Sequence, residues 1–260
     1  MAKAFAVKAV ALVAIVGAFA LLPTTAALVA AIAILVATIG FLTYAIAWPS
    51  AQFFAPVVHH LTGPVVALTF DDGPDPVWTP RLLDLLAARG ARATFFVLGE
   101  RAARHPDVVR RIHAEGHSVG THTQHHTLKF HFASAAYVER EIVEAIAVVA
   151  AIVPEPPRLF RPPQGLRTPS FAAGWQRTRD LTCVTWSVRG LDSFQTTAAK
   201  IVARITPRLE PGAIVTLHDG TGLGGGNDRA PTLAALATIL DRCAELGLRC
   251  VALGPTGAAR

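Results

Sequence analysis

Apolar residues follow two different patterns along the chain, and the change between them divides the protein into two parts. Between Lys8 and Asp71 the sequence contains no charged residue, and residues 9–22 and 26–47 form two almost continuous apolar runs. A helix needs about 20 apolar residues to cross the roughly 30 Å hydrocarbon core of a bilayer. The pattern therefore predicts a membrane anchor in residues 1–50.

The anchor can be organised in two ways. We expect two membrane helices, at about residues 4–22 and 26–47, and a signal peptide followed by one span is the alternative. Lys3 and Lys8 favour a cytoplasmic N-terminus. Two spans would return the rest of the chain to the cytoplasmic side, whereas a single crossing would export it, so the face that carries it stays open. Either arrangement implies an integral protein of the bacterial cytoplasmic (inner) membrane, with membrane lipid as a partner.

The rest of the chain alternates short apolar runs with amphipathic stretches, after a proline-containing tether at residues 51–63. Strand followed by helix, repeated about seven times, is typical of a parallel sheet with crossover helices. We predict strands at residues 65–70, 93–98, 118–120, 159–161, 182–187, 213–217 and 249–253, and helices at residues 79–89, 100–115, 134–152, 169–179, 196–209 and 231–246. The pattern predicts an α/β fold, a distorted and incomplete (β/α) barrel over residues 64–254 with a tail at 255–260. An open doubly wound sheet fits the periodicity almost as well.

Charge and cysteine content narrow the possible partners. The net charge is +6, but the arginines are scattered over the predicted helices and form no dense basic run interleaved with aromatic residues, so nucleic acid is not an expected partner. Cys183, Cys243 and Cys250 lack the spacing of a metal site and are interpreted as small buried thiols. A Cys243–Cys250 disulfide is conceivable only in an oxidising compartment.

Two adjacent carboxylates, Asp71 and Asp72, follow the apolar run at residues 65–70, and Gly73-Pro74 ends that run at once. Functional groups gather at the carboxyl ends of parallel strands, so both side chains are expected at the active edge of the sheet. Neighbouring carboxylates repel each other unless a positive group lies beside them. A metal ion on one and a proton-transfer role for the other would remove that cost, whereas a solvated turn is the non-catalytic interpretation.

A histidine-rich segment at residues 116–126 supplies candidate metal ligands. His122 and His126 are four residues apart, a spacing that on a helical turn places both rings on one face. With Asp72 they make a set of two imidazoles and one carboxylate that leaves coordination positions free. A histidine-rich surface loop is the alternative. The competing ligand candidates are His117, His125 and, to a lesser extent, His131.

Three more polar clusters follow predicted strands. The segment F-R-P-P-Q-G (160–165) presents Arg161 on a backbone stiffened by two prolines, where its guanidinium can orient an acidic partner. The segments W-S-V-R-G-L-D (186–192) and T-L-H-D-G (216–220) contain Asp192 and His218. A buried Asp near a His would fix the imidazole tautomer and raise its pKa, which makes the imidazole a proton donor near neutral pH. A structural salt bridge and capped strand ends are the non-catalytic interpretations.

In this order, the five clusters resemble the motifs of the NodB-homology polysaccharide deacetylases, a group of metal-dependent carbohydrate esterases and deacetylases. The resemblance covers about residues 64–253 and includes T-F-D-D-G-P, H-T-x-x-H, R-P-P-x-G, an Asp after W-S, and a strand that ends in H-D. It implies the distorted (β/α) barrel of that family and one divalent metal ion, with Zn²⁺ as the expected ion. It also implies hydrolysis of N-acetyl groups on amino sugars.

The resemblance implies a role for each matching residue. The metal ligands would be Asp72, His122 and His126. Asp71 would be the general base, held by Arg161. His218 would be the general acid, oriented by Asp192. The metal and the backbone N–H of Gln164 would stabilise the oxyanion. The expected substrate-binding residues are Gln164, Trp186, Thr216 and Leu217.

Three positions depart from the family pattern: Gln164 replaces a usual aromatic residue, Ser193 stands where Trp is frequent, and Thr216 stands where the pattern has Leu. These positions line the expected pocket and carry none of the chemistry, so the reaction type is retained and the substrate is left open. We expect a membrane-anchored, metal-dependent hydrolase that removes N-acetyl or another small acyl group from the amino sugars of a polysaccharide or lipid-linked saccharide. The alternatives are an O-acetyl esterase and a glycan-binding protein with a relic site.

Overall fold

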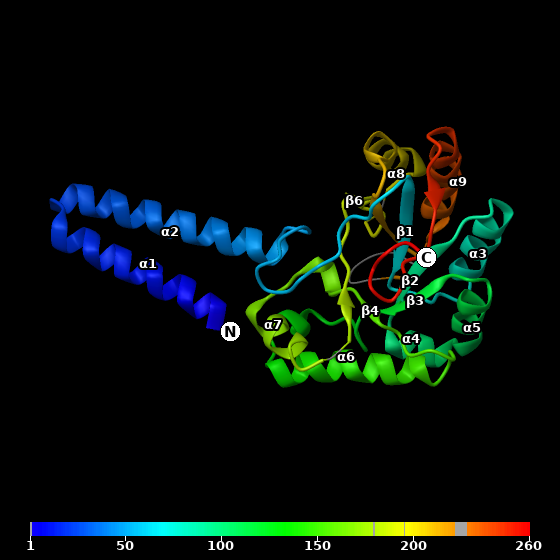
Figure 1. Ribbon diagram of the computed structural model, residues 1–260, viewed down its shortest axis with the longest axis horizontal. Coiled ribbons are helices and arrows are strands. Elements are labelled where there is room, and N and C mark those ends of the chain that lie inside the picture. The colour runs from blue at the N-terminus through cyan, green and yellow to red at the C-terminus, as the bar shows by residue number, and fades with distance from the viewer. Residues whose placement is uncertain (1, 179, 195, 222–227) are drawn as a thin grey trace.

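The computed structural model describes residues 2–178, 180–194, 196–221 and 228–260, and these form two distinct parts (Figure 1). Two long helices at the N-terminal end make a hairpin that projects away from an α/β domain, and the α/β domain contains every described strand. The two apolarity patterns of the sequence therefore correspond to two structural units.

The hairpin consists of α1 (Ala2–Leu21) and α2 (Thr24–Ala47), which pack side by side (Figure 1). The buried residues of these helices are Ala4, Ala27 and Ala45, whose small side chains allow the two backbones to approach closely. Many of the larger apolar side chains of both helices, such as Phe5, Leu21, Val29 and Val36, are exposed. By length and composition, both helices could cross a membrane.

The α/β domain is built on a curled eight-stranded sheet. Its strands are β1 (Val65–Asp71), β2 (Ala93–Val97), β3 (Ser118–Thr121), β4 (Leu159–Phe160), β5 (Thr182–Cys183), β6 (Val188–Arg189), β7 (Ile214–His218) and β8 (Arg249–Cys250). The order across the sheet is β5-β4-β3-β2-β1-β7-β6, with β8 paired to β1, and all of these pairings are parallel. The predicted incomplete (β/α) barrel is confirmed.

The central strand, β1, places the first carboxylates in the middle of the active edge. All seven of its residues are buried, as expected for a strand covered on both faces. Its register sets Asp71 opposite Phe96 of β2 on one side and opposite His218 of β7 on the other. Two candidate catalytic side chains from distant parts of the sequence therefore come from neighbouring strand ends.

Helices cover the outer face of the sheet: α3 (Trp78–Ala88), α4 (Gly99–Arg104), α5 (Pro106–Ala114), α6 (Ala135–Ala150), α7 (Pro169–Trp175), α8 (Ala198–Ile205) and α9 (Ala230–Glu245). Alternate residues of β7 show how the two faces differ. Val215 and Leu217 pack in the large core that includes residues of α3, α5, α8 and α9, whereas Ile214 belongs to a smaller cluster on the inner face. Because side chains alternate between the two faces along a strand, Thr216 and His218 lie on the same face as Ile214, which is the interior of the curled sheet.

Two predicted helices are interrupted. The helix predicted at 100–115 is two helices, α4 and α5, because Pro106 cannot continue the preceding helix and starts a new one. The helix predicted at 196–209 is the shorter α8, followed by a 3₁₀ turn that contains Pro207.

Two other predicted elements are shorter than expected. The strand predicted at 182–187 is the two-residue β5, and the separate strand β6, which starts only at Val188, was not predicted. The helix predicted at 169–179 is α7, which ends at Trp175, and Arg179 lies outside the described residues. The cysteines are free thiols, of which Cys183 and Cys243 are buried, as predicted, and Cys250 is partly buried.

The segment predicted to be a tether, residues 51–63, is packed into the α/β domain instead. Val58 forms a parallel bridge with Val184, just after β5, and His60 forms an antiparallel bridge with Ala213, just before β7. The segment therefore connects the two open sides of the sheet. Its apolar residues explain this packing, because Ala51, Phe54, Ala55, Val57 and Leu61 are all buried.

Hydrogen bonds fix the end of α2 to loops of the α/β domain. The fully buried Arg167 donates to the backbone carbonyl of Trp48, and the backbone N–H of Arg167 donates to the carbonyl of Ile46 (3.0 Å). Oγ1 of Thr185 donates to the carbonyl of Pro49 (2.8 Å). The hairpin is therefore attached directly to the loops that follow β4 and β5, without a flexible connection.

Candidate active site

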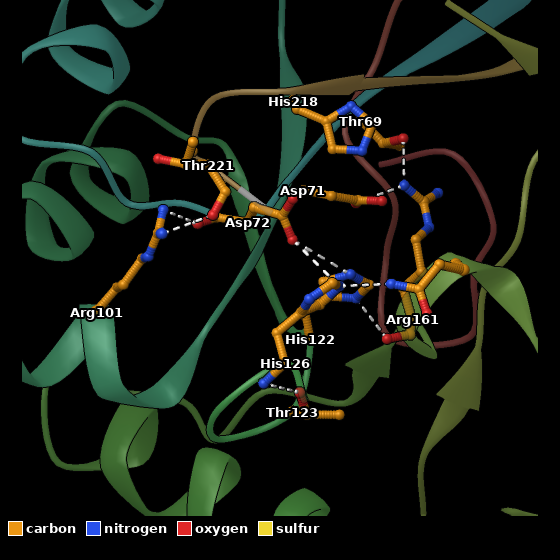
Figure 2. A network of polar contacts seen from close by, with 12 residues as sticks. Thr69, Asp71, Asp72, Arg101, His122, Thr123, His126, Arg161, His218 and Thr221 are labelled. Atoms are coloured by element: carbon orange, nitrogen blue, oxygen red, sulfur yellow. Dashed lines mark hydrogen bonds and ion pairs between the residues drawn. The ribbon is translucent and has the colours of Figure 1, made fainter. Parts of the chain in front are cut away.

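The candidate site begins where β1 ends. Asp72 follows the strand with a left-handed backbone conformation (φ 70°), which is uncommon for a residue other than glycine. The backbone carbonyl of Asp72 accepts a hydrogen bond from Nη1 of Arg101 (2.8 Å), which helps to hold this conformation (Figure 2). Gly73 is required at the next position, because a Cβ atom there would lie 2.1 Å from Oδ2 of Asp219.

Asp219 is a buried carboxyl that the sequence analysis did not single out. Its Oδ2 accepts a hydrogen bond from Oγ1 of Thr79 (2.5 Å). Burial raises the pKa of Asp219 to about 7, although the Thr79 hydrogen bond acts in the opposite direction. The sequence H-D-G, which begins at the last residue of β7, was the available signal for this carboxyl. In the structure, Asp219 lies behind the Asp72–Gly73 turn and supports that turn.

Three predicted metal ligands, Asp72, His122 and His126, come together in the structure (Figure 2). Oδ1 of Asp72 lies 3.6 Å from Nε2 of His122 and 3.5 Å from Nε2 of His126. One ligand atom from each residue lies within 4.8 Å of the other two, and all three residues are buried. Oδ1 of Asp72 has no hydrogen-bond partner among the described residues. This unpaired, buried carboxylate oxygen fits a divalent cation.

The protonation of His122 also fits metal binding. Its Nδ1 donates to the backbone carbonyl of Arg161 (2.6 Å), which leaves Nε2 free to bind a cation. Burial, followed by the nearby His126, lowers the pKa of His122 to about 3, so the imidazole is neutral. Two imidazole nitrogens and one carboxylate oxygen are a donor set that zinc enzymes use with an open coordination position.

The two histidines converge by a different backbone path from the predicted one. They lie in the loop after β3 and not on a helical turn, so the helical interpretation of their spacing was wrong. Thr123 and His126 have positive φ values (75° and 50°), and Oγ1 of Thr123 accepts a hydrogen bond from the backbone N–H of His126 (3.0 Å). The competing histidines have other partners: His117 with Ala93, His125 with Glu141, and His131 with Gln164.

Asp71 is held by the fully buried Arg161. Nη1 of Arg161 donates to Oδ1 of Asp71 (2.8 Å) and to Oγ1 of Thr69 (2.7 Å), and Nη2 donates to the backbone carbonyl of Thr185 (2.9 Å). The guanidinium carbon also lies 4.2 Å from the centre of the Phe96 ring. Figure 2 shows the Asp71 carboxylate directed toward this guanidinium and not toward the two histidines. The orientation of Asp71 is therefore fixed by its partners.

His218 and Asp192 form a second buried pair. Nδ1 of His218 lies 2.8 Å from Oδ1 of Asp192, while the backbone N–H of His218 and Oγ1 of Thr232 donate to Oδ2. Burial alone would lower the pKa of His218, but the Asp192 charge and hydrogen bond outweigh it and raise the pKa to about 9. The imidazole is therefore protonated at neutral pH, with Nε2 available as a proton donor.

These groups surround one pocket with a volume of about 90 Å³, roughly the space that three water molecules occupy in the liquid. Of the predicted substrate-binding residues, Gln164, Trp186 and Thr216 line it. Leu217 does not, because strand alternation directs its side chain into the core on the opposite face of β7. The lining residues are Asp71, Asp72, His122, His126, Gln164, Trp186, Arg189, Ser193, Phe194, Thr216 and His218.

Besides Phe194, Arg189 is a pocket residue that the sequence analysis did not single out. It lies on β6, and its guanidinium carbon is 5.4 Å from the centre of the Trp186 ring. The segment W-S-V-R-G-L-D contained a signal for this strand, because apolar and polar side chains alternate along residues 186–189. The short strand β6 was not predicted, so the face of the sheet that Arg189 occupies could not be inferred.

Comparison with known proteins agrees with this geometry. Residues 59–181 match the family model described as polysaccharide deacetylase. A peptidoglycan-N-acetylglucosamine deacetylase of Bacillus cereus is 37% identical over 188 residues, which covers 72% of this chain and 85% of the relative.

Solved structures give the same result. The crystal structure of a peptidoglycan N-acetylglucosamine deacetylase superimposes with a TM-score of 0.70 at 30% identity, and the match covers 77% of this chain and 91% of that chain. A family 4 acetyl xylan esterase from Clostridium thermocellum, solved in complex with a cobalt ion, has a TM-score of 0.64 at 30% identity, with 72% and 87% covered. On this sequence and structural similarity, the chain belongs to the polysaccharide deacetylase family of hydrolases.

Proposed function

We propose that the protein is a membrane-anchored, metal-dependent hydrolase that removes N-acetyl or another small acyl group from amino sugars of a polysaccharide or glycolipid. The observation that carries this proposal is the convergence of Asp72, His122 and His126 beside two oriented proton-transfer groups. The relatives named above as deacetylases act on N-acetylglucosamine of peptidoglycan, which supports an acylated amino sugar as the substrate class.

Asp72, His122 and His126 would hold one divalent cation, with Zn²⁺ as the expected ion. When bound, such a cation polarises an acyl carbonyl and lowers the pKa of a water molecule. The neutral state of His122 and the unpaired oxygen of Asp72 are prepared for this role. The other steps fall to residues of the chain itself.

Asp71 is the proposed general base. Its Oδ1 accepts a hydrogen bond from Arg161, which gives the carboxylate one fixed orientation in the pocket. The register of β1 and β7 places Asp71 and His218 opposite each other at the ends of neighbouring strands. The scissile bond would lie between the two side chains. The carboxylate is therefore positioned to remove a proton from the attacking water.

His218 is the proposed general acid. An amide is a poor substrate for hydrolysis unless its nitrogen is protonated as the bond breaks. His218 is protonated at neutral pH because of Asp192, which also fixes the ring orientation through Nδ1. Transfer of the proton from Nε2 to the leaving nitrogen would release the free amine of the sugar.

The size of the pocket and the position of the hairpin support the finer parts of the proposal. A volume of about 90 Å³ suits an acetyl-sized group. The two apolar helices would anchor the protein in the membrane, and the bonds from Arg167 and Thr185 would hold the pocket at a fixed position relative to it. A glycolipid or a wall polysaccharide close to the membrane surface would be accessible.

An O-acetyl esterase is the second candidate, because a structure with 30% identity is an acetyl xylan esterase. The leaving group of an ester is an alkoxide, which needs protonation less than the amine of an amide does. The same residues could therefore cleave an ester. The oriented His218–Asp192 pair favours the amide, since only the amide requires a strong acid.

The test uses the full-length protein in detergent, loaded with Zn²⁺. It is incubated with N-acetylglucosamine oligomers, peptidoglycan fragments and acetylated xylan, and each product is examined by mass spectrometry. We expect the loss of acetyl from the amino sugars, and no loss with Asp71→Asn. Cleavage of xylan acetate alone would establish the esterase instead. No acetyl loss from any of the three would contradict both activities.

A further inference from the structure

Two polar side chains in the catalytic pocket have no hydrogen-bond or ion-pair partner among the residues that the structure describes. Within the described residues, the guanidinium of Arg189 takes part in no hydrogen bond or ion pair, and its Nε is buried. Oγ1 of Thr216 is also buried without a hydrogen-bond partner, and the residue is only 1% exposed. Buried donors without partners are uncommon and costly, so each such group calls for an explanation.

These two side chains are neighbours across the sheet. The register of β6 and β7 places Arg189 directly opposite Thr216. Both residues line the pocket, whereas Val188 and Val215, one residue earlier on each strand, are buried in the outer core. Arg189 is supported from the side by Trp186, whose ring centre lies 5.4 Å from the guanidinium carbon. A cation and a hydroxyl thus lie together on one wall of the pocket.

The other charges in the pocket are already accounted for. Asp71 is paired with Arg161, and His218 is paired with Asp192. The unpaired oxygen of Asp72 faces the two histidine nitrogens of the proposed metal centre. Arg189 is the only arginine among the described lining residues, and no hydrogen bond or ion pair within them neutralises its charge. A guanidinium in such a position is suited to bind an oxyanion through several N–H groups.

We propose that Arg189 and Thr216 form an anion subsite for the substrate, so that the preferred amino sugar carries a carboxylate or phosphate group near its acylated nitrogen. The inference rests on the proposed function and makes its substrate class more specific. An acidic ether substituent on the sugar, or the phosphate of a lipid-linked sugar, would supply the same oxyanion chemistry. Arg189 would form charge-assisted hydrogen bonds to it, and Thr216 would donate one more.

The test compares three N-acetylated sugars with the full-length, Zn²⁺-loaded protein. They are the methyl glycoside of N-acetylglucosamine, which is neutral, the methyl glycoside of N-acetylmuramic acid, which carries a carboxylate, and N-acetylglucosamine 1-phosphate. We expect a higher kcat/KM for at least one anionic sugar than for the neutral one, and the better anion identifies the source. Arg189→Gln should lower kcat/KM for that sugar by roughly 10- to 100-fold, mainly through KM, and should change the neutral sugar much less.

Two further variants make the result specific. Arg189→Lys keeps a charge and should recover part of the loss, while Arg208→Gln removes an exposed arginine outside the pocket and should change neither sugar. Equal losses on neutral and anionic sugars in Arg189→Gln would show a structural role and overturn the proposal. A wild type that does not prefer either anion would also overturn it, while leaving the deacetylase function intact.

Binding without turnover separates the two proposals completely. The dissociation constant of N-acetylglucosamine 1-phosphate can be measured by calorimetry in the Asp71→Asn background, which should not turn the sugar over, with and without Arg189→Gln. A weaker affinity in the double variant supports the subsite even if the wild type deacetylates no sugar, in which case the proposed function alone would fail. Identical affinities would overturn the subsite for phosphate, and the same measurement with the methyl glycoside of N-acetylmuramic acid decides for carboxylate.

Discussion

The two sides of the pocket differ in how their polar groups are satisfied. On the metal side, at the ends of β1 and β3, Asp72, His122 and His126 face one another, and Asp71 is tied to a buried arginine. On the β6–β7 side, His218 has a partner, but Arg189 and Thr216 have no hydrogen-bond partner among the described residues. In the proposed mechanism, the metal side carries a reaction common to every substrate, whereas the β6–β7 side depends on what the substrate brings. Substitutions on the metal side should therefore affect all substrates, and those on the β6–β7 side should affect them selectively.

The largest expected effect comes from Asp72→Ala on the metal side. Without this carboxylate, only the two imidazoles of the ligand set remain, and the cation should be lost from purified protein. We expect kcat/KM to fall by on the order of 10³-fold or more for amide and ester substrates alike. Metal content measured by mass spectrometry and turnover of both substrates check this, with the exposed Asp107→Ala as a control. Full metal occupancy in Asp72→Ala would show that the ligand set is wrong.

His218→Ala, on the other side, should distinguish between leaving groups. Loss of the acid should reduce amide hydrolysis by roughly 10²- to 10⁴-fold, because the amine must be protonated to leave. Cleavage of an activated acetate ester needs no such proton and should fall far less. The ratio of the two rates in the variant is the measurement. An equal reduction for both substrates would remove His218 from the role of acid.

The pH dependence of stability provides a smaller and separate test of the β6–β7 side. The pKa of His218 is raised to about 9 from an ordinary value of 6.5. The charged pair with Asp192 therefore contributes its full stability below pH 6.5 and loses it as the pH rises through about 9. The difference corresponds to about 3 kcal/mol.

This stability change is best measured in metal-free protein, where the cation adds nothing to the curve. The free energy of unfolding of the wild type should fall between pH 6.5 and 9 relative to His218→Gln. Asp219, whose pKa is raised to about 7, titrates in both proteins and cancels in the difference. Parallel curves for the two proteins would mean that His218 and Asp192 do not form a charged pair.

The metal side could be predicted from sequence far more completely than the β6–β7 side. Dense sequence motifs contain the four polar residues of the metal side, Asp71, Asp72, His122 and His126. The proposed chemistry requires these side chains to lie close together, whatever conformation the local backbone adopts. Their convergence was predicted although the helical turn proposed for the histidines does not exist. In contrast, the placement of Arg189 and Leu217 depends on strand register and alternation. The two-residue strand β6 is too short to leave a periodic signal, so the placement of Arg189 could not be derived. Leu217 lies on the longer β7, where alternation with His218 directs it into the core, and its expected role came from the resemblance alone.

Thr216→Val should produce the smallest effect, and it tests the contrast between the two sides at a single atom. Valine has nearly the shape of threonine, and the hydroxyl that it removes is buried without a partner. We therefore expect the free energy of unfolding to stay the same or to rise by up to about 1 kcal/mol. Affinity for the anionic sugar should fall by about threefold, the value of one modest hydrogen bond. Denaturant unfolding and calorimetry measure the two quantities. A destabilised variant would mean that the hydroxyl already has a partner in the protein, and that it is not reserved for a substrate.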